Sequence, residues 1–113
     1  MTQHQLQACI DACIRCAQEC DNCAQACMVE SDAASLTECV RWDRDCADMC
    51  RLAVNFMRRD SHFLEEVCRL CGEFCNGCAD ECAKHDHDHC QRCAEACRQC
   101  AEECYRMSGV PTA

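Results

Sequence analysis

The sequence predicts an all-α protein, an up-down-up-down four-helix bundle with a cysteine-lined core. Four segments carry cysteines at alternating steps of three and four residues, the spacing of the inward face of a bundled helix. The connections between these segments are short, which favours antiparallel neighbours. No stretch shows the polar–apolar alternation of a β-strand. We therefore expect residues 1–113 to form a single four-helix-bundle domain.

The first helix is expected over residues 3–29. Its cysteines follow one another at steps of 4, 3, 4, 3 and 4 residues, and Leu6 takes the preceding position on the same face. Such a face normally carries leucine or isoleucine, so thiols here replace the usual core residues. The cysteines of this inward face are Cys9, Cys13, Cys16, Cys20, Cys23 and Cys27.

The second helix is expected over residues 33–58, with Ser31 or Asp32 as its N-terminal cap. The inward face of this helix repeats the same spacing with fewer thiols. Its positions are Leu36, Cys39, Asp43, Cys46, Cys50, Ala53 and Met57.

The third helix is expected over residues 62–84, capped at Asp60 or Ser61. Gly72 and Gly77 each lower its helix propensity by about 1 kcal/mol relative to alanine. They either permit close approach by a neighbouring helix or have no particular role. The inward positions are Leu64, Cys68, Cys71, Cys75, Cys78 and Cys82.

The fourth helix is expected over residues 87–107 after a short turn in which Asp86 serves as cap. Gly109 and Pro111 end it. Its inward positions are Cys90, Cys93, Cys97, Cys100, Cys104 and Met107.

Composition excludes several classes of function. The net charge is −9, with 11 basic against 20 acidic residues, so neither a nucleic acid nor an anionic membrane is an expected partner. The first residues lack the apolar stretch of a signal peptide, and no segment predicts a membrane span. We expect a reducing, cytoplasmic location. The cysteine count of 19 is odd, so complete intramolecular disulfide pairing is impossible.

Cysteines four apart on a helix share one face and lie about 6 Å apart along the axis, so two thiolates can hold one soft ion. Cys39, Cys68 and Cys90 fall outside such pairs and are expected to bridge between helices. Thiolate selects Cu(I), zinc or iron–sulfur clusters. The eight pairs are Cys9/Cys13, Cys16/Cys20, Cys23/Cys27, Cys46/Cys50, Cys71/Cys75, Cys78/Cys82, Cys93/Cys97 and Cys100/Cys104.

Charge distinguishes among these soft metals. A tetrahedral Zn²⁺ site with four thiolates carries a net charge of −2, and several such sites in one closed core are costly. Cu⁺ with one thiolate is neutral, so a thiol core can hold many Cu(I) ions. The alternatives are a general thiolate sink for Zn²⁺ or Cd²⁺ and a disulfide-stapled structural bundle. Iron–sulfur motifs place their cysteines on loops, which does not match this pattern.

The repeated Cys-x-x-x-Cys pattern within helices, at both 3 and 4 steps, resembles that of the copper storage proteins of the cytosolic type. The resemblance covers the whole chain from the first helix to the fourth. It implies a non-enzymatic store of many Cu(I) ions, each held mostly by two or three thiolates. It also implies a homotetramer with copper entering at one end. A copper chaperone or a low-molecular-weight thiol is a candidate partner for delivery.

The two ends of the predicted bundle differ. One end gathers an apolar plug of Leu6, Met57, Leu64 and Met107, where the methionines are interpreted as core residues and His4 and His62 as surface residues. The opposite end is the expected mouth, at which His85 and His89 are candidate metal ligands. The alternative is that the histidines belong to a polar cap and turn exposed to solvent. This end gathers Cys27, Cys39, Cys82, Cys90 and the turn His85-Asp86-His87-Asp88-His89.

Asp43 stands where a cysteine is expected on the second helix. A bare buried carboxylate is costly, so we expect it to bind a metal near the mouth or to pair with Arg41, Arg44 or a histidine.

Apolar residues beside the inward faces exceed what one bundle is expected to bury. They favour a subunit interface, and the alternative is coverage by long side chains of neighbouring helices. These residues are Ile10, Ile14, Val40, Trp42, Ala47, Met49, Val54 and Phe56.

Overall fold

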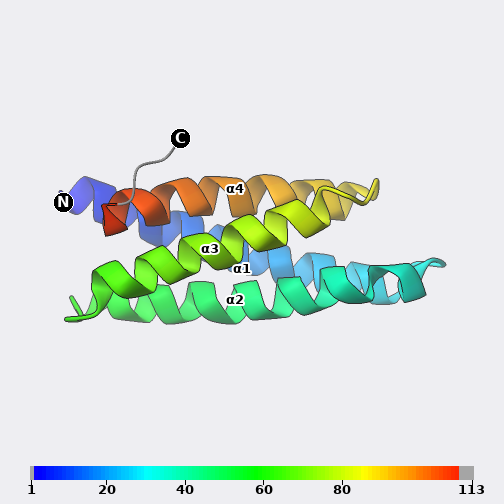
Figure 1. The fold of residues 1–113 in the computed structure, drawn as a ribbon, viewed down its shortest axis with the longest axis horizontal. Helices are drawn as coiled ribbons and strands as arrows, with labels where there is room; N and C mark the ends of the chain where they lie inside the picture. The colour runs from blue at the N-terminus through cyan, green and yellow to red at the C-terminus, as the bar shows by residue number, and fades with distance from the viewer. Residues whose placement is uncertain (1, 110–113) are drawn as a thin grey trace.

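The structure is a computed structural model of the chain, and it describes residues 2–109. Four α-helices run back and forth along one long axis (Figure 1). No strand occurs in the described range, so the predicted all-α bundle is confirmed. The elements are α1 (Gln3–Met28), a short 3-10 helix η1 (Ala33–Leu36), α2 (Thr37–Arg58), α3 (Leu64–Cys82) and α4 (Asp88–Ser108).

Each helix packs against two neighbours, which gives the bundle its closed interior. Helix α1 contacts α2 and α4, and α3 contacts the same two helices from the opposite corner. The α1–α2 and α3–α4 connections lie together at one end of the bundle, and the α2–α3 connection lies at the other (Figure 1). None of the helices within residues 2–109 has the length and apolar character that crossing a membrane requires.

The helix ends differ from the predicted caps. Helix α1 begins with a capping box that sequence analysis did not identify, in which the Gln5 amide donates to Thr2 Oγ1 and the Thr2 amide to Gln5 Oε1. Before α2, the chain forms η1 instead of entering the helix directly. Asp32 occupies the cap position of η1 without a side-chain capping bond, and α2 begins only at Thr37.

The predicted caps of α3 and α4 are also wrong. Phe63 holds the cap position of α3, and the Ser61 hydroxyl accepts from the Phe63 amide 3.1 Å away. His87, not Asp86, precedes α4. The predicted stop at Gly109 is confirmed, since its φ of 77° is left-handed and suits glycine. Pro111 lies outside the described residues.

Cysteine is the most frequent residue of the interior. All 19 cysteines are fully buried and all are free thiols. Buried free cysteine acts as a small hydrophobe, so the protein can close this core without metal. The apolar end residues Met57, Leu64 and Met107 are buried as expected, and Leu6 is partly buried against them.

Two glycines of α3 admit aromatic rings from neighbouring helices. A Cβ at Gly77 would lie 2.3 Å from the Trp42 ring, and one at Gly72 would lie 2.6 Å from the Tyr105 ring. The Asn76 amide donates to the Tyr105 hydroxyl at 3.1 Å. Close approach therefore explains both glycines.

The expectation that one bundle cannot bury its extra apolar residues is wrong for half of them. Ile10, Ala47, Met49 and Val54 are buried within the chain itself. The side chains pack beside the thiol core, where α1 and α2 meet their neighbours. Trp42 remains 37 % exposed although its ring packs on α3.

Candidate metal centre

The four inward faces bring their sulfurs within contact distance across the bundle axis. Neighbours four apart on one helix come close, as with Cys23 and Cys27 at 3.8 Å. The shortest distances, however, join different helices: 3.4 Å between Cys39 and Cys82, 3.5 Å between Cys16 and Cys97, and 3.5 Å between Cys13 and Cys100. A metal site in this core would therefore use thiols from several helices, rather than only the pair on one helix that the spacing predicts.

Such sets recur along the bundle. Each contains four buried cysteines whose sulfurs all lie within 4.8 Å of one another. Five of the sets are Cys13/Cys71/Cys100/Cys104, Cys16/Cys46/Cys50/Cys75, Cys16/Cys20/Cys46/Cys97, Cys20/Cys78/Cys93/Cys97 and Cys23/Cys27/Cys39/Cys90. Because the sets share members such as Cys16 and Cys20, one sulfur can bridge two ions.

The sulfur spacing suits thiolate coordination in general. Ligands about 2.3 Å from a tetrahedral metal stand about 3.8 Å apart, close to the distances in this core. Spacing alone therefore fits Zn²⁺ as well as Cu(I), and the metal is decided by charge. Shared thiolates around Cu⁺ add little net charge. Each four-thiolate Zn²⁺ site instead adds two negative charges to an interior in which none of the described basic side chains is buried.

Several thiols of the apo core resist ionisation, whereas hydrogen bonds with neighbouring thiols lower the pKa of others. Burial, followed by the charge of Cys27, raises the pKa of the Cys90 thiol to about 12. Hydrogen bonds, first of all with Cys104, together with burial raise the pKa of Cys9 above its ordinary value, and Cys68 is among its partners. Thiolate is the ligand form, so metal binding must release protons.

Asp43 is fully buried among thiols rather than beside an arginine or a histidine. Its Oδ1 lies 3.2 Å from Cys93 Sγ and 3.3 Å from both Cys78 Sγ and Cys82 Sγ. Burial, followed by the charge of Cys93, raises the pKa of the Asp43 carboxyl to about 8. A carboxyl in this position adds an oxygen donor to the sulfur core.

The arginines expected near Asp43 face elsewhere. Arg41 pairs with Glu38 at 3.3 Å on the surface, and the Arg44 guanidinium contacts Met28 Sδ. Thiols instead satisfy the carboxylate, and no buried polar side-chain atom of residues 2–109 lacks a partner.

At one end of the bundle, a histidine contacts the thiols of the core. We call this end the mouth and define it by Cys27, Cys39, Cys82 and Cys90. His89 Nδ1 lies 3.6 Å from Cys90 Sγ and 3.9 Å from Cys27 Sγ. This ring nitrogen is placed to join the thiols at the end of the core.

His85 has a different environment. Its Nε2 lies 2.8 Å from Glu81 Oε2, one turn back along the chain, and this contact holds the ring beside α3. At the opposite end of the bundle, His4 and His62 are exposed, as expected.

The carboxylates that contact the histidines are not among the residues predicted from the sequence. Glu81 precedes His85 by four residues, a helical spacing from which the contact could have been predicted. Glu30 contacts His89 across 59 residues of sequence, and no local signal indicates that pairing.

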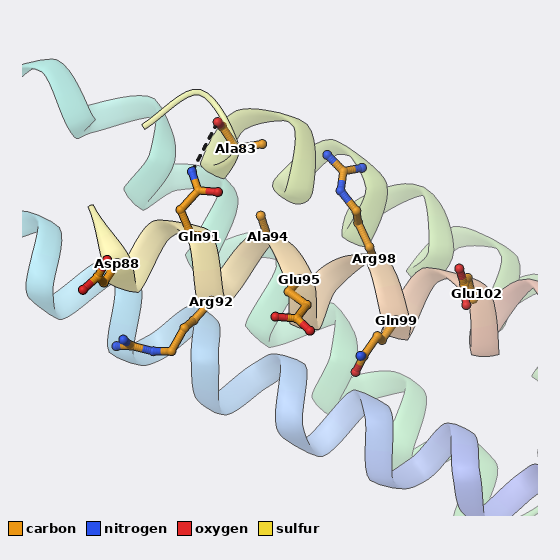
Figure 2. Close-up of a pocket in the computed structure, with 9 residues that line it drawn as sticks. All are labelled: Ala83, Asp88, Gln91, Arg92, Ala94, Glu95, Arg98, Gln99 and Glu102. Atoms are coloured by element: carbon orange, nitrogen blue, oxygen red, sulfur yellow. Dashed lines mark hydrogen bonds between the residues drawn. The ribbon is translucent and has the colours of Figure 1, made fainter. Parts of the chain in front are cut away.

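A hollow on the outer side of α4 is a different kind of surface. Figure 2 shows that its lining side chains are charged, amide or alanine, with the Gln91 amide donating to the Ala83 carbonyl at 3.4 Å. None of the nine lining residues is a cysteine, and the hollow lies outside the thiol core.

Comparisons with known proteins agree with this geometry. A family model described as copper storage protein matches residues 2–109. The uncharacterised cysteine-rich protein YhjQ of Bacillus subtilis (strain 168) is 52% identical over 83 residues, which cover 74% of this chain and 77% of that protein.

Solved structures are similar along nearly the whole chain. The Cu(I)-bound copper storage protein BsCsp3 is 51% identical with a TM-score of 0.88, over 92% of this chain and 98% of that one. A cytosolic copper storage protein from Streptomyces lividans, solved with five coppers, is 39% identical with a TM-score of 0.91, over 96% of both chains.

Proposed function

The chain belongs to the copper storage protein family, and on that premise we propose that it sequesters many Cu(I) ions on its core thiolates. One observation carries the proposal: all 19 cysteines are free, fully buried thiols, and most of them fall into sets of four whose sulfurs lie within 4.8 Å of one another. A catalytic site needs an open coordination position or a reactive group facing substrate. A closed core of shared thiols instead suits a store, and we propose that the protein is not an enzyme.

The proposed ligands are the buried sulfurs, with Asp43 and His89 as additional donors near the mouth. His85 remains a prediction, since Glu81 holds its ring. We propose that residues 1–113 form one copper-binding domain. Its sulfur ligands are Cys9, Cys13, Cys16, Cys20, Cys23, Cys27, Cys39, Cys46, Cys50, Cys68, Cys71, Cys75, Cys78, Cys82, Cys90, Cys93, Cys97, Cys100 and Cys104.

The proposed setting is the cytosol, where thiols stay reduced. A relative from Streptomyces lividans is described as cytosolic, which supports this location. We propose a homotetramer on family grounds, with a copper chaperone or a low-molecular-weight thiol delivering the metal at the mouth.

Cu(I) titration of the reduced apo protein, kept free of air, tests the proposal. We expect uptake to continue to a stoichiometry near the thiol count of 19, with little change in helicity because the sulfurs are already gathered. The readouts are thiolate-to-copper absorption in the ultraviolet, circular dichroism, and a chelator that reports free Cu(I). Saturation at one or two ions would contradict the proposal.

The same preparation separates the alternatives. Competition with Zn²⁺ at matched free-metal concentrations should leave Cu(I) in the core, and displacement by Zn²⁺ would favour a general thiolate sink. Thiol counting before metal addition should find nearly all 19 cysteines reactive in unfolded protein. A count near zero would favour the disulfide-stapled bundle.

A further inference from the structure

A cluster of nitrogen and oxygen donors lies just outside the thiol core, above the mouth. Glu30 follows the end of α1, and His87 and His89 begin α4. The Glu30 carboxylate oxygen Oε2 lies 2.8 Å from His89 Nε2 and 3.2 Å from His87 Nδ1. The two imidazole rings are stacked, with centroids 5.2 Å apart and planes within 7°. One carboxylate oxygen and two ring nitrogens thus converge from two separate connections of the bundle.

We propose that Glu30, His87 and His89 form a site for one divalent first-row transition-metal ion, Zn²⁺ being the best-suited member of that class. Ligands 2.0–2.2 Å from a tetrahedral ion stand about 3.3–3.6 Å apart. The donors of this cluster, which now lie at hydrogen-bond distances of 2.8 and 3.2 Å, need to separate by less than about 1 Å to admit such an ion. Imidazole and carboxylate favour divalent ions of borderline softness, whereas the thiols below favour Cu(I). The two sites therefore differ in chemistry although they adjoin in space.

Asp32 supports this arrangement from outside. Its carboxylate oxygens lie 3.0 and 3.1 Å from His87 Nε2, which leaves Nδ1 of the same ring for the ion. A carboxylate that accepts from the second ring nitrogen is the usual support of a metal-binding histidine. The His87 ring is 30 % exposed and the Glu30 side chain 31 %, so an ion can reach the cluster from solvent.

His89 links the divalent site to the mouth. Its Nε2 faces Glu30, and its Nδ1 faces the sulfurs of Cys90 and Cys27. A neutral imidazole offers a lone pair at one nitrogen and carries hydrogen at the other. A divalent ion on Nε2 therefore keeps a proton on Nδ1 and prevents that nitrogen from binding Cu(I). This exclusion rests on the proposed function, whereas the divalent site itself does not.

Mn²⁺ is the probe for the site, because thiols bind this hard ion poorly and the apo protein can be used intact. Free Mn²⁺ is measured by its electron paramagnetic resonance signal as protein is added. We expect one Mn²⁺ per chain, with affinity lowered at least about tenfold by Glu30→Gln and by His87→Ala, and about tenfold by Asp32→Asn. Asp86→Asn, in the adjoining turn, and His62→Ala, at the opposite end, are matched controls expected to bind as the wild type does.

The exclusion is tested on protein loaded fully with Cu(I), whose Mn²⁺ affinity should be at least about tenfold weaker than that of the apo protein. Equal affinities would overturn the shared use of His89. Absence of Mn²⁺ binding by the apo protein, or equal binding by wild type, Glu30→Gln and His87→Ala, would overturn the site. Copper capacity is measured separately by titration, so failure of the proposed function is recognised independently of these results.

Discussion

Loading with Cu(I) is expected to raise the thermal unfolding midpoint of this protein by roughly 20 °C or more. An ion present at a thousand times its dissociation constant stabilises the folded state by about 4 kcal/mol. Each kcal/mol shifts the midpoint of a chain of this size by about 4 °C. The binding of even a few ions should therefore raise the unfolding midpoint by more than about 20 °C. Unfolded cysteines also bind Cu(I), but they lack sets of four sulfurs within 4.8 Å.

The composition of the core makes this effect large. Cysteine is small, and aromatic residues make up only 4% of the chain, so hydrophobic burial contributes less than in a leucine-rich bundle. Much of the stability of the loaded protein should then come from sulfur–metal bonds.

Circular dichroism melts of apo and loaded protein under reducing, air-free conditions measure the effect. The matched control is loaded protein stripped by a Cu(I) chelator, which should melt at the apo temperature. Identical midpoints for apo and loaded protein would mean that copper does not bind within the folded core.

The apo protein is expected to lose stability as pH rises from about 4 to about 8, and Asp43 is the main cause. Its carboxyl has a folded-state pKa of about 8 against an ordinary value of 3.8. Between these values the folded state holds a proton that the unfolded state has released. Stability falls with rising pH wherever the folded state binds more protons. The contribution is full below pH 4 and lost as pH passes 8, with an upper limit of about 6 kcal/mol.

Urea unfolding at several pH values between 4 and 8 measures this dependence. Asp43→Asn removes the titrating group but keeps its size, so the free energy of unfolding of this variant should change much less with pH. Asp45→Asn, an exposed aspartate on the same helix, is the matched control and should retain the wild-type slope. Parallel pH profiles for wild type and Asp43→Asn would show that the Asp43 carboxyl is not protonated in the folded protein.

The inward faces could be predicted because the 3–4 spacing is a direct consequence of 3.6 residues per helical turn. Every cysteine on those faces is buried, and Asp43, the one polar residue among them, is buried as well. Short connections then fixed antiparallel neighbours, and the plug and mouth followed from which residues share an end.

The contacts between helices could not be predicted from the sequence. The partners of Asp43 depend on how α3 and α4 are rotated, and Cys78 and Cys93 lie 35 and 50 residues away. The cap predicted for the second helix was also wrong. The chain makes a 3-10 turn, η1, before α2, and the Asp32 side chain contacts His87 instead of capping the helix. Local propensity does not report such tertiary contacts.

The most direct test of a copper-storing thiol core is a crystal structure of the Cu(I)-loaded protein with anomalous scattering measured at the copper edge. We expect a column of copper peaks along the bundle axis, each within bonding distance of sulfurs from the cysteine sets. Copper confined to the surface, or cysteines joined in disulfides with no peaks between the helices, would contradict this expectation.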